Sequence, residues 1–262
     1  MELLQHRHIS RHIYYGLSVL AFFVLILVGS RAYANTSPFG DFYDKRGNKI
    51  GSDGKNDGKK FLVTKRSDTR TIRKITRLGG TIQEKNVRSS VVLPSDAALR
   101  ESLAVLNRTE EIGGLKEQSS IVMKDDSVIR GMVGERARIE NNLQIAECIL
   151  PALPEGKTRA DVETTIHPHP TTVTYESGGL YPHSATTPST VDRGTFAYFT
   201  TNIIVGPVDQ ITFVGGHRIF GAPKIANRRM GIAVYYHNGN KPSVIMTKRV
   251  AEKILNLDGK LN

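Results

Sequence analysis

The sequence contains one cysteine, Cys148, in 262 residues. A single cysteine excludes an internal disulfide framework and any zinc site built from several thiolates. It also excludes the zinc deaminases, which need a second Cys-x-x-Cys half-site. The His-Glu-x-x-His helix of the zincins and the Gly-x-Ser-x-Gly turn of the serine hydrolases are both missing. Because Cys148 lies in an apolar stretch, we expect a buried and unreactive thiol rather than a nucleophile.

Long apolar runs are also scarce, because only residues 13–29 form one. A basic segment with Arg7 and Arg11 precedes this run, and Ala32-Tyr33-Ala34 follows it. This order predicts a secretory signal peptide over residues 1–34, with an uncleaved anchor helix at 13–29 as the alternative. Both interpretations place the rest of the chain outside the cytoplasm, either exported or held at the membrane.

The charge of the chain is +11, and most of it lies beyond the N-terminal segment. Residues 65–90 contain eight basic residues against Asp68 and Glu84. This segment is interpreted as a solvated basic linker, or as a surface for an anionic component of the cell envelope. It has no aromatic side chain on which bases could stack, so nucleic acid is not expected as a partner.

The remaining sequence predicts two further regions. In residues 35–64, short apolar pieces alternate with Gly, Asn and Asp turns, which predicts a small β-rich leader. Over residues 91–262, expected helices alternate with expected strands, which predicts an α/β fold with a mixed β-sheet flanked by helices. The expected helices cover 96–106 and 248–255, and the expected strands lie near 120–123, 162–166, 202–206, 210–214 and 231–236.

Two histidines separated by one residue, His167 and His169, follow the expected strand 162–166. In an extended chain both side chains point to the same side. Asp192 could add a carboxylate oxygen, and two His with one Asp are typical of a catalytic zinc site that leaves one position for water. Zinc (Zn²⁺) is therefore the expected cofactor. A general base is also needed, and Glu111 in Glu-Ile-Gly-Gly-Leu is the candidate.

These residues resemble the JAMM metallopeptidase family, also called MPN+ or JAB. That family has a Glu ahead of a Gly-Leu strand, then His-x-His-Pro and Ser-x-x-Asp, which match 111–115, 167–170 and 189–192 here. The resemblance implies His167, His169 and Asp192 as zinc ligands, Glu111 as the acid/base and Ser189 as a stabiliser of the oxyanion. It implies hydrolysis of a peptide or isopeptide bond in a protein or peptide substrate.

The stretch between His169 and Ser189 holds 19 residues, more than the family usually has there. The assignment therefore requires residues 175–187 to loop out, and Gly178, Gly179 and Pro182 make this physically reasonable. His183 lies in the insert as a spare potential ligand. The insert and the Asp-Phe-Tyr-Asp-x-x-Gly-Asn-x-Ile-Gly-Ser-Asp-Gly segment at 41–54 resemble, more loosely, the JAB-like domains of bacterial polymorphic toxins, which implies a toxin-like effector with an immunity protein. The alternative is an inactive scaffold that binds an anionic envelope partner.

Overall fold

The computed structural model describes residues 40–54, 58–83, 87–141, 143–176, 179–209 and 228–257. The chain divides into two compact units, Met1–Pro38 and Phe39–Asn262, and all described residues belong to the second. The expected signal peptide or anchor and the expected strand at 210–214 lie outside the described residues. Within the described part of the chain, no helix combines the length and the apolar character needed to cross a bilayer.

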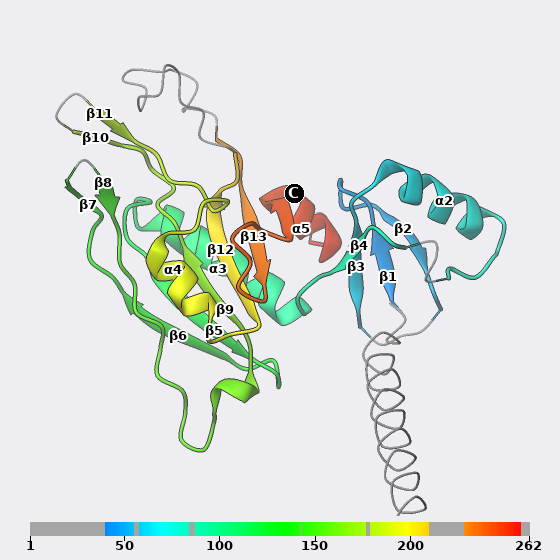
Figure 1. Cartoon of the computed structure of the whole chain (residues 1–262), viewed down its shortest axis with the longest axis horizontal. Helices are drawn as coiled ribbons and strands as arrows, with labels where there is room; N and C mark the ends of the chain where they lie inside the picture. Colours follow the sequence, from blue (N-terminus) through cyan, green and yellow to red (C-terminus); the bar gives the residue numbers. More distant parts are fainter. Residues whose placement is uncertain are drawn as a thin grey trace, which may run out of the picture. The chain divides into compact units, whose positions relative to one another are not determined.

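A six-stranded mixed sheet forms the centre of the larger part of the fold (Figure 1). Strands β12 and β9 are parallel, and the other neighbouring pairs are antiparallel. The predicted mixed α/β class is therefore confirmed. Its strands, in spatial order, are β14 (Val244–Thr247), β13 (Met230–Tyr236), β12 (Thr201–Pro207), β9 (Val162–Pro168), β5 (Gln118–Met123) and β6 (Val128–Val133).

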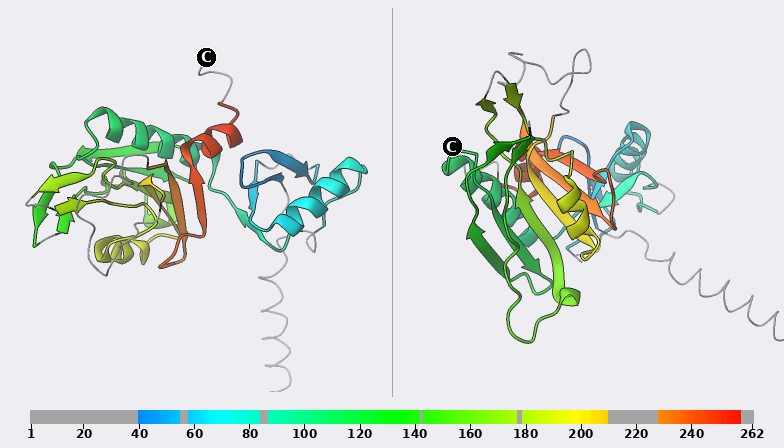
Figure 2. Two further views of the ribbon diagram at one scale, coloured as in Figure 1. Left: turned by 90° about the horizontal axis from the view of Figure 1, so that it is seen from above. Right: turned by 60° about the vertical axis from the view of Figure 1, so that its left-hand side comes forward.

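Helices cover both faces of this sheet. Alternate side chains of each strand point to opposite faces, so each face forms its own apolar core with the helices packed on it. On β13, Ile232 and Val234 belong to the core under α3 (Asp96–Glu111) and α5 (Lys248–Ile254). Ala233 and Tyr235 belong to a separate cluster with Phe196 of α4 (Thr190–Phe196). Figure 2 shows α3 and α4 on opposite sides of the sheet. The sheet thus has an α3 face and an α4 face.

Helix α3 is the best predicted element of the fold. Ser95 caps it, since its hydroxyl accepts from the backbone N–H of Ala98. Leu99, Leu103 and Leu106 are buried on the side that faces the sheet, as their spacing predicts. The helix continues past the expected end at residue 106 to Glu111.

A second sheet precedes α3 in the chain. It has the order β2-β1-β3-β4, and α2 (Arg66–Arg77) packs against it with Ile72 fully buried. The residues 65–90 that were expected as a linker contain α2 and the first residue of β4, because Ile72 of α2 packs into the core of this sheet. We refer to residues 41–92 as the α2 layer. Its strands are β1 (Asp41–Tyr43), β2 (Lys49–Ser52), β3 (Lys60–Val63) and β4 (Ser90–Val92).

Two hairpins and a short 3-10 helix complete the described elements. The hairpins are β7 (Arg138–Glu140) with β8 (Leu143–Ile145), and β10 (Thr174–Glu176) with β11 (Gly179–Tyr181). The second hairpin occupies the insert between His169 and Ser189, where looping out was expected. The Gln144 side-chain amide donates to the Thr174 hydroxyl and so links the two hairpins. The 3-10 helix is η2 (Arg159–Asp161).

Candidate metal centre

Strand β9 positions the two histidines. His167 lies near its end, and His169 continues the extended chain because its backbone N–H donates to the Val205 carbonyl of β12 at 2.8 Å. The neighbouring Gly206 has φ +148°, and a Cβ there would lie 3.1 Å from the His169 carbonyl oxygen. Glycine is favoured at this position, because side-chain-bearing residues rarely adopt this φ and a Cβ would also crowd the His169 backbone.

Helix α4 brings Asp192 to the histidines. Ser189 is its N-cap: the serine hydroxyl accepts from the Asp192 backbone N–H at 3.1 Å. In return, the Ser189 backbone N–H donates to Asp192 Oδ2 at 2.6 Å. This capping box holds the aspartate rotamer at the first turn. Phe196 anchors the other end of the helix against Tyr235, with ring centroids 4.9 Å apart.

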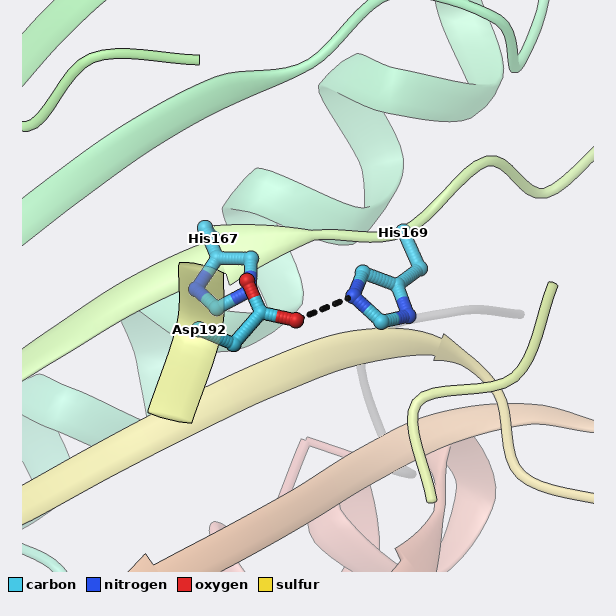
Figure 3. Close-up of side chains that lie close together, drawn as sticks. All are labelled: His167, His169 and Asp192. Atoms are coloured by element: carbon cyan, nitrogen blue, oxygen red, sulfur yellow. Dashed lines mark hydrogen bonds and ion pairs between the residues drawn. The ribbon is translucent and has the colours of Figure 1, made fainter. Parts of the chain in front are cut away.

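The three side chains converge on one point (Figure 3). Asp192 Oδ1 lies 3.1 Å from His167 Nε2, and Asp192 Oδ2 lies 3.2 Å from His169 Nε2. One ligand atom from each residue can be chosen so that all lie within 4.8 Å of one another. Both imidazoles are buried, with 8% of His167 and 6% of His169 exposed. The sequence therefore named three residues that the fold brings together.

His169 is held in a defined orientation by a backbone group. Its Nδ1 lies 2.9 Å from the Ser184 carbonyl oxygen. Because a carbonyl only accepts, Nδ1 carries a proton and Nε2 is the nitrogen presented to Asp192. Ligating histidines are commonly fixed by such a second hydrogen bond.

His167 provides the test of whether a metal fits. Its Nε2 is buried and lacks a hydrogen bond, although it is close to Asp192. Buried polar atoms are nearly always satisfied, so an atom of this kind needs a partner. Two imidazole nitrogens and a carboxylate oxygen are a donor set that zinc accepts. The three residues could therefore hold a metal ion.

The charges of the cluster are strongly coupled. Burial opposes ionisation of Asp192, yet the contacts with His167 and His169 hold the pKa of its carboxyl far below the usual range. Burial works in the opposite direction on His169, but Asp192 and Glu117 raise the pKa of its imidazole above the ordinary value. The site thus favours an ionised carboxylate at Asp192, which is the form that a bound cation would also favour.

Glu117 is the functional candidate that sequence analysis missed. It directly precedes β5 and is 4% exposed. Burial raises the pKa of its carboxyl, against the attraction of His169 and His167. Gln118 and Val122 face α3, since Gln118 bonds Arg108 and Val122 packs in the core under that helix. The alternation of side chains along the strand therefore places Glu117 on the α4 face, with the histidines. The signal was this alternation, but the strand was expected to begin only near residue 120.

Glu111, the predicted acid/base, does not join the cluster. It is the last residue of α3 and is exposed to solvent. The physical reason is the length of the helix: α3 extends through Glu111, and Gly113 (φ +91°) and Gly114 (φ +74°) then turn the chain toward β5. The Glu-Ile-Gly-Gly-Leu segment is therefore the end of α3 and the turn that leads to β5, and Glu111 itself belongs to the helix. On geometry, Glu117 replaces Glu111 as the candidate.

Two further groups border the centre. The thiol of Cys148 is hydrogen-bonded to Glu117, and burial together with the Glu117 charge raises its pKa. The His183 ring lies edge-on to His169, with centroids 5.6 Å apart, and its Nε2 is 3.1 Å from the Gln144 carbonyl oxygen. His183 is thus a neighbour of the three-residue cluster and not a member of it.

No family model, curated protein or solved structure matches the chain. What this site can do therefore follows from its own residues.

Proposed function

We propose that the chain is a zinc-dependent peptidase or isopeptidase of the JAMM type. The observation that carries the proposal is the convergence of His167, His169 and Asp192 within 4.8 Å, next to the buried carboxyl of Glu117. Three protein ligands leave a coordination position for substrate or water, which is characteristic of catalytic and not structural zinc sites. A zinc ion held there would polarise the scissile carbonyl and make the attacking water more acidic.

Glu117 is proposed as the proton carrier. Its carboxylate takes a proton from the attacking water as oxygen bonds to the carbonyl carbon, and donates it to the leaving nitrogen as the C–N bond breaks. The products are one carboxylic acid and one amine, and Glu117 returns to its starting state. A carboxyl whose pKa is raised by burial suits both halves of this task, because general acid–base catalysis is most efficient when that pKa lies near the working pH.

Ser189 has two roles in this proposal. Its hydroxyl oxygen accepts the cap hydrogen bond from Asp192, so it orients a ligand. A hydroxyl that accepts one bond still has a proton to donate. We assign that proton to the oxygen of the carbonyl under attack, where charge develops.

We also propose where the enzyme acts and what class of substrate it cleaves. The apolar run at 13–29 supports an exported or membrane-anchored enzyme, whose substrate would be a protein or peptide outside the cytoplasm. A toxin-like effector of this kind would be matched by an immunity protein that protects the producing cell.

Zinc content tests the proposal. The full chain is purified without added metal, and bound zinc is measured for the wild type and for His167→Ala/His169→Ala. We expect about one zinc per chain in the wild type and none in the double variant. The matched control is His237→Asn, because His237 is exposed and its φ of +50° is a conformation that asparagine tolerates. Absence of zinc from the wild type after zinc supplementation would leave an inactive binding scaffold as the better interpretation.

A further inference from the structure

Beyond the N-terminal segment, the excess positive charge of the chain is concentrated in the α2 layer. Residues 41–93 contain 14 Lys and Arg against six Asp and Glu, whereas residues 94–262 contain 19 against 18. Residues 94–262, which contain the candidate metal centre, are thus nearly neutral, whereas residues 41–93 carry almost all of the excess positive charge. Such an asymmetry indicates an anionic partner for one region and not for the whole protein.

Helix α2 arranges this charge as a stripe. Arg66, Arg70, Arg73 and Arg77 follow one another at intervals of four, three and four residues, which places them on one face of the helix. All four are exposed, and Ile72 is buried on the other side. At 1.5 Å per residue the stripe is about 16 Å long. We call these four residues the arginine stripe.

Most of the stripe is not neutralised by the protein. Arg73 pairs with Asp44, and its side chain remains 49% exposed. Within the described ranges, no carboxylate pairs with Arg66, Arg70 or Arg77. The one acid of α2, Asp68, accepts from the Ser89 backbone N–H at 3.1 Å and from the Ser67 hydroxyl. Three guanidinium groups are therefore available to an external anion.

We propose that the arginine stripe binds the phosphate headgroups of an anionic membrane. Guanidinium groups pair with phosphate through two parallel hydrogen bonds. The apolar run at 13–29 ends 12 residues before Asp41, so a membrane-bound run would tether the α2 layer within about 40 Å of the bilayer. Leu78, directly after α2, is 73% exposed and provides an apolar side chain for the headgroup boundary. This interaction is independent of catalysis at the metal centre.

Vesicle binding by the full chain tests the inference. Sedimentation is compared for vesicles of phosphatidylcholine alone and for vesicles that also contain phosphatidylglycerol, because the apolar run can bind both and only the difference reports on charge. The variant is Arg66→Gln/Arg70→Gln/Arg77→Gln, which keeps Ile72 and the Arg73–Asp44 pair. The matched control is Arg100→Gln/Lys124→Gln/Arg249→Gln, which removes the same charge from exposed positions outside the α2 layer.

The expected result is a preference of the wild type for anionic vesicles that weakens at about 1 M salt, where the screening length falls to ~3 Å. Each basic residue near such a surface contributes about fivefold, so the stripe variant should lose about 100-fold of the preference and the control variant little. Equal binding to both vesicles, or equal losses in both variants, would overturn the inference. So would tighter binding of a duplex DNA than of anionic vesicles at the same salt. An unchanged melting curve shows that the stripe variant is folded.

Discussion

Exchanging each of two glutamates for glutamine distinguishes the proposed proton carrier from the residue that the sequence suggested. In Glu117→Gln, the side chain keeps its size and can still accept a hydrogen bond from Cys148, but it can no longer carry a proton. In Glu111→Gln, the change falls on an exposed helix end. Both variants make the same chemical change, one at a buried carboxyl beside the histidines and one at an exposed carboxyl away from them.

The structure sets the expected size of each effect. Loss of a general acid–base group lowers the rate of the chemical step by about 10²–10⁴-fold, and this is expected for Glu117→Gln. Zinc content should not change, because Glu117 is not one of the three clustered residues that could hold a metal ion. The free energy of unfolding should fall by no more than about 1 kcal/mol, since burial already disfavours the charged carboxyl and the amide removes that cost.

The assay is cleavage of a peptide library by the zinc-loaded wild type, followed by rate measurements on the mapped sites with both variants. Zinc analysis and a urea titration accompany each rate. Glu111→Gln is expected to cleave at the wild-type rate. A large loss of rate in Glu111→Gln, together with normal cleavage by Glu117→Gln, would refute the reasoning that places the proton carrier before β5.

Three more predictions concern buried contacts on the two faces of the sheet. Phe196→Ala should lower the free energy of unfolding by about 3–5 kcal/mol in a urea titration, because Phe196 is 2% exposed, and it should also weaken zinc binding because α4 carries Asp192. Glu101→Gln should destabilise the fold by about 1.5–3 kcal/mol at neutral pH, since the buried Glu101 carboxylate loses its charge-assisted hydrogen bonds to Arg108 and Arg130, whose own side chains are partly exposed. Burial opposes the charge of Glu101, but Arg130, Arg108 and Ser120 lower the pKa of its carboxyl. The stabilisation by the ionised Glu101 is therefore fully present above about pH 4.3 and is lost as the pH falls through the lowered pKa. Urea titrations at pH 7 and pH 3 should show a smaller difference in unfolding free energy between wild type and variant at pH 3. Cys148 should react with a thiol reagent at pH 8 at least about tenfold more slowly in the folded chain than in urea, and an equal rate would contradict its burial against Glu117.

Local patterns were sufficient where neighbouring residues determine the outcome. The cap at Ser95 and the leucine spacing after it predicted α3, since both act within one or two turns. The alternation in β9 predicted that His167 and His169 share a face. The start of α4 is local in the same way, because Ser189 and Asp192 satisfy each other's backbone groups.

Long-range packing decided the rest. The basic stretch is a helix because Ile72 fills the core of the β1–β4 sheet, although Lys65 provides no side-chain cap and the charge pattern favoured a linker. The choice of glutamate depended on where α3 ends and on the pairing of β5 with β9, neither of which is encoded within the Glu-Ile-Gly-Gly-Leu segment itself. By itself the sequence determined the candidate ligand types and their local geometry. Only the tertiary structure decided that Glu117 stands beside them, because burial and strand register depend on residues distant in the chain.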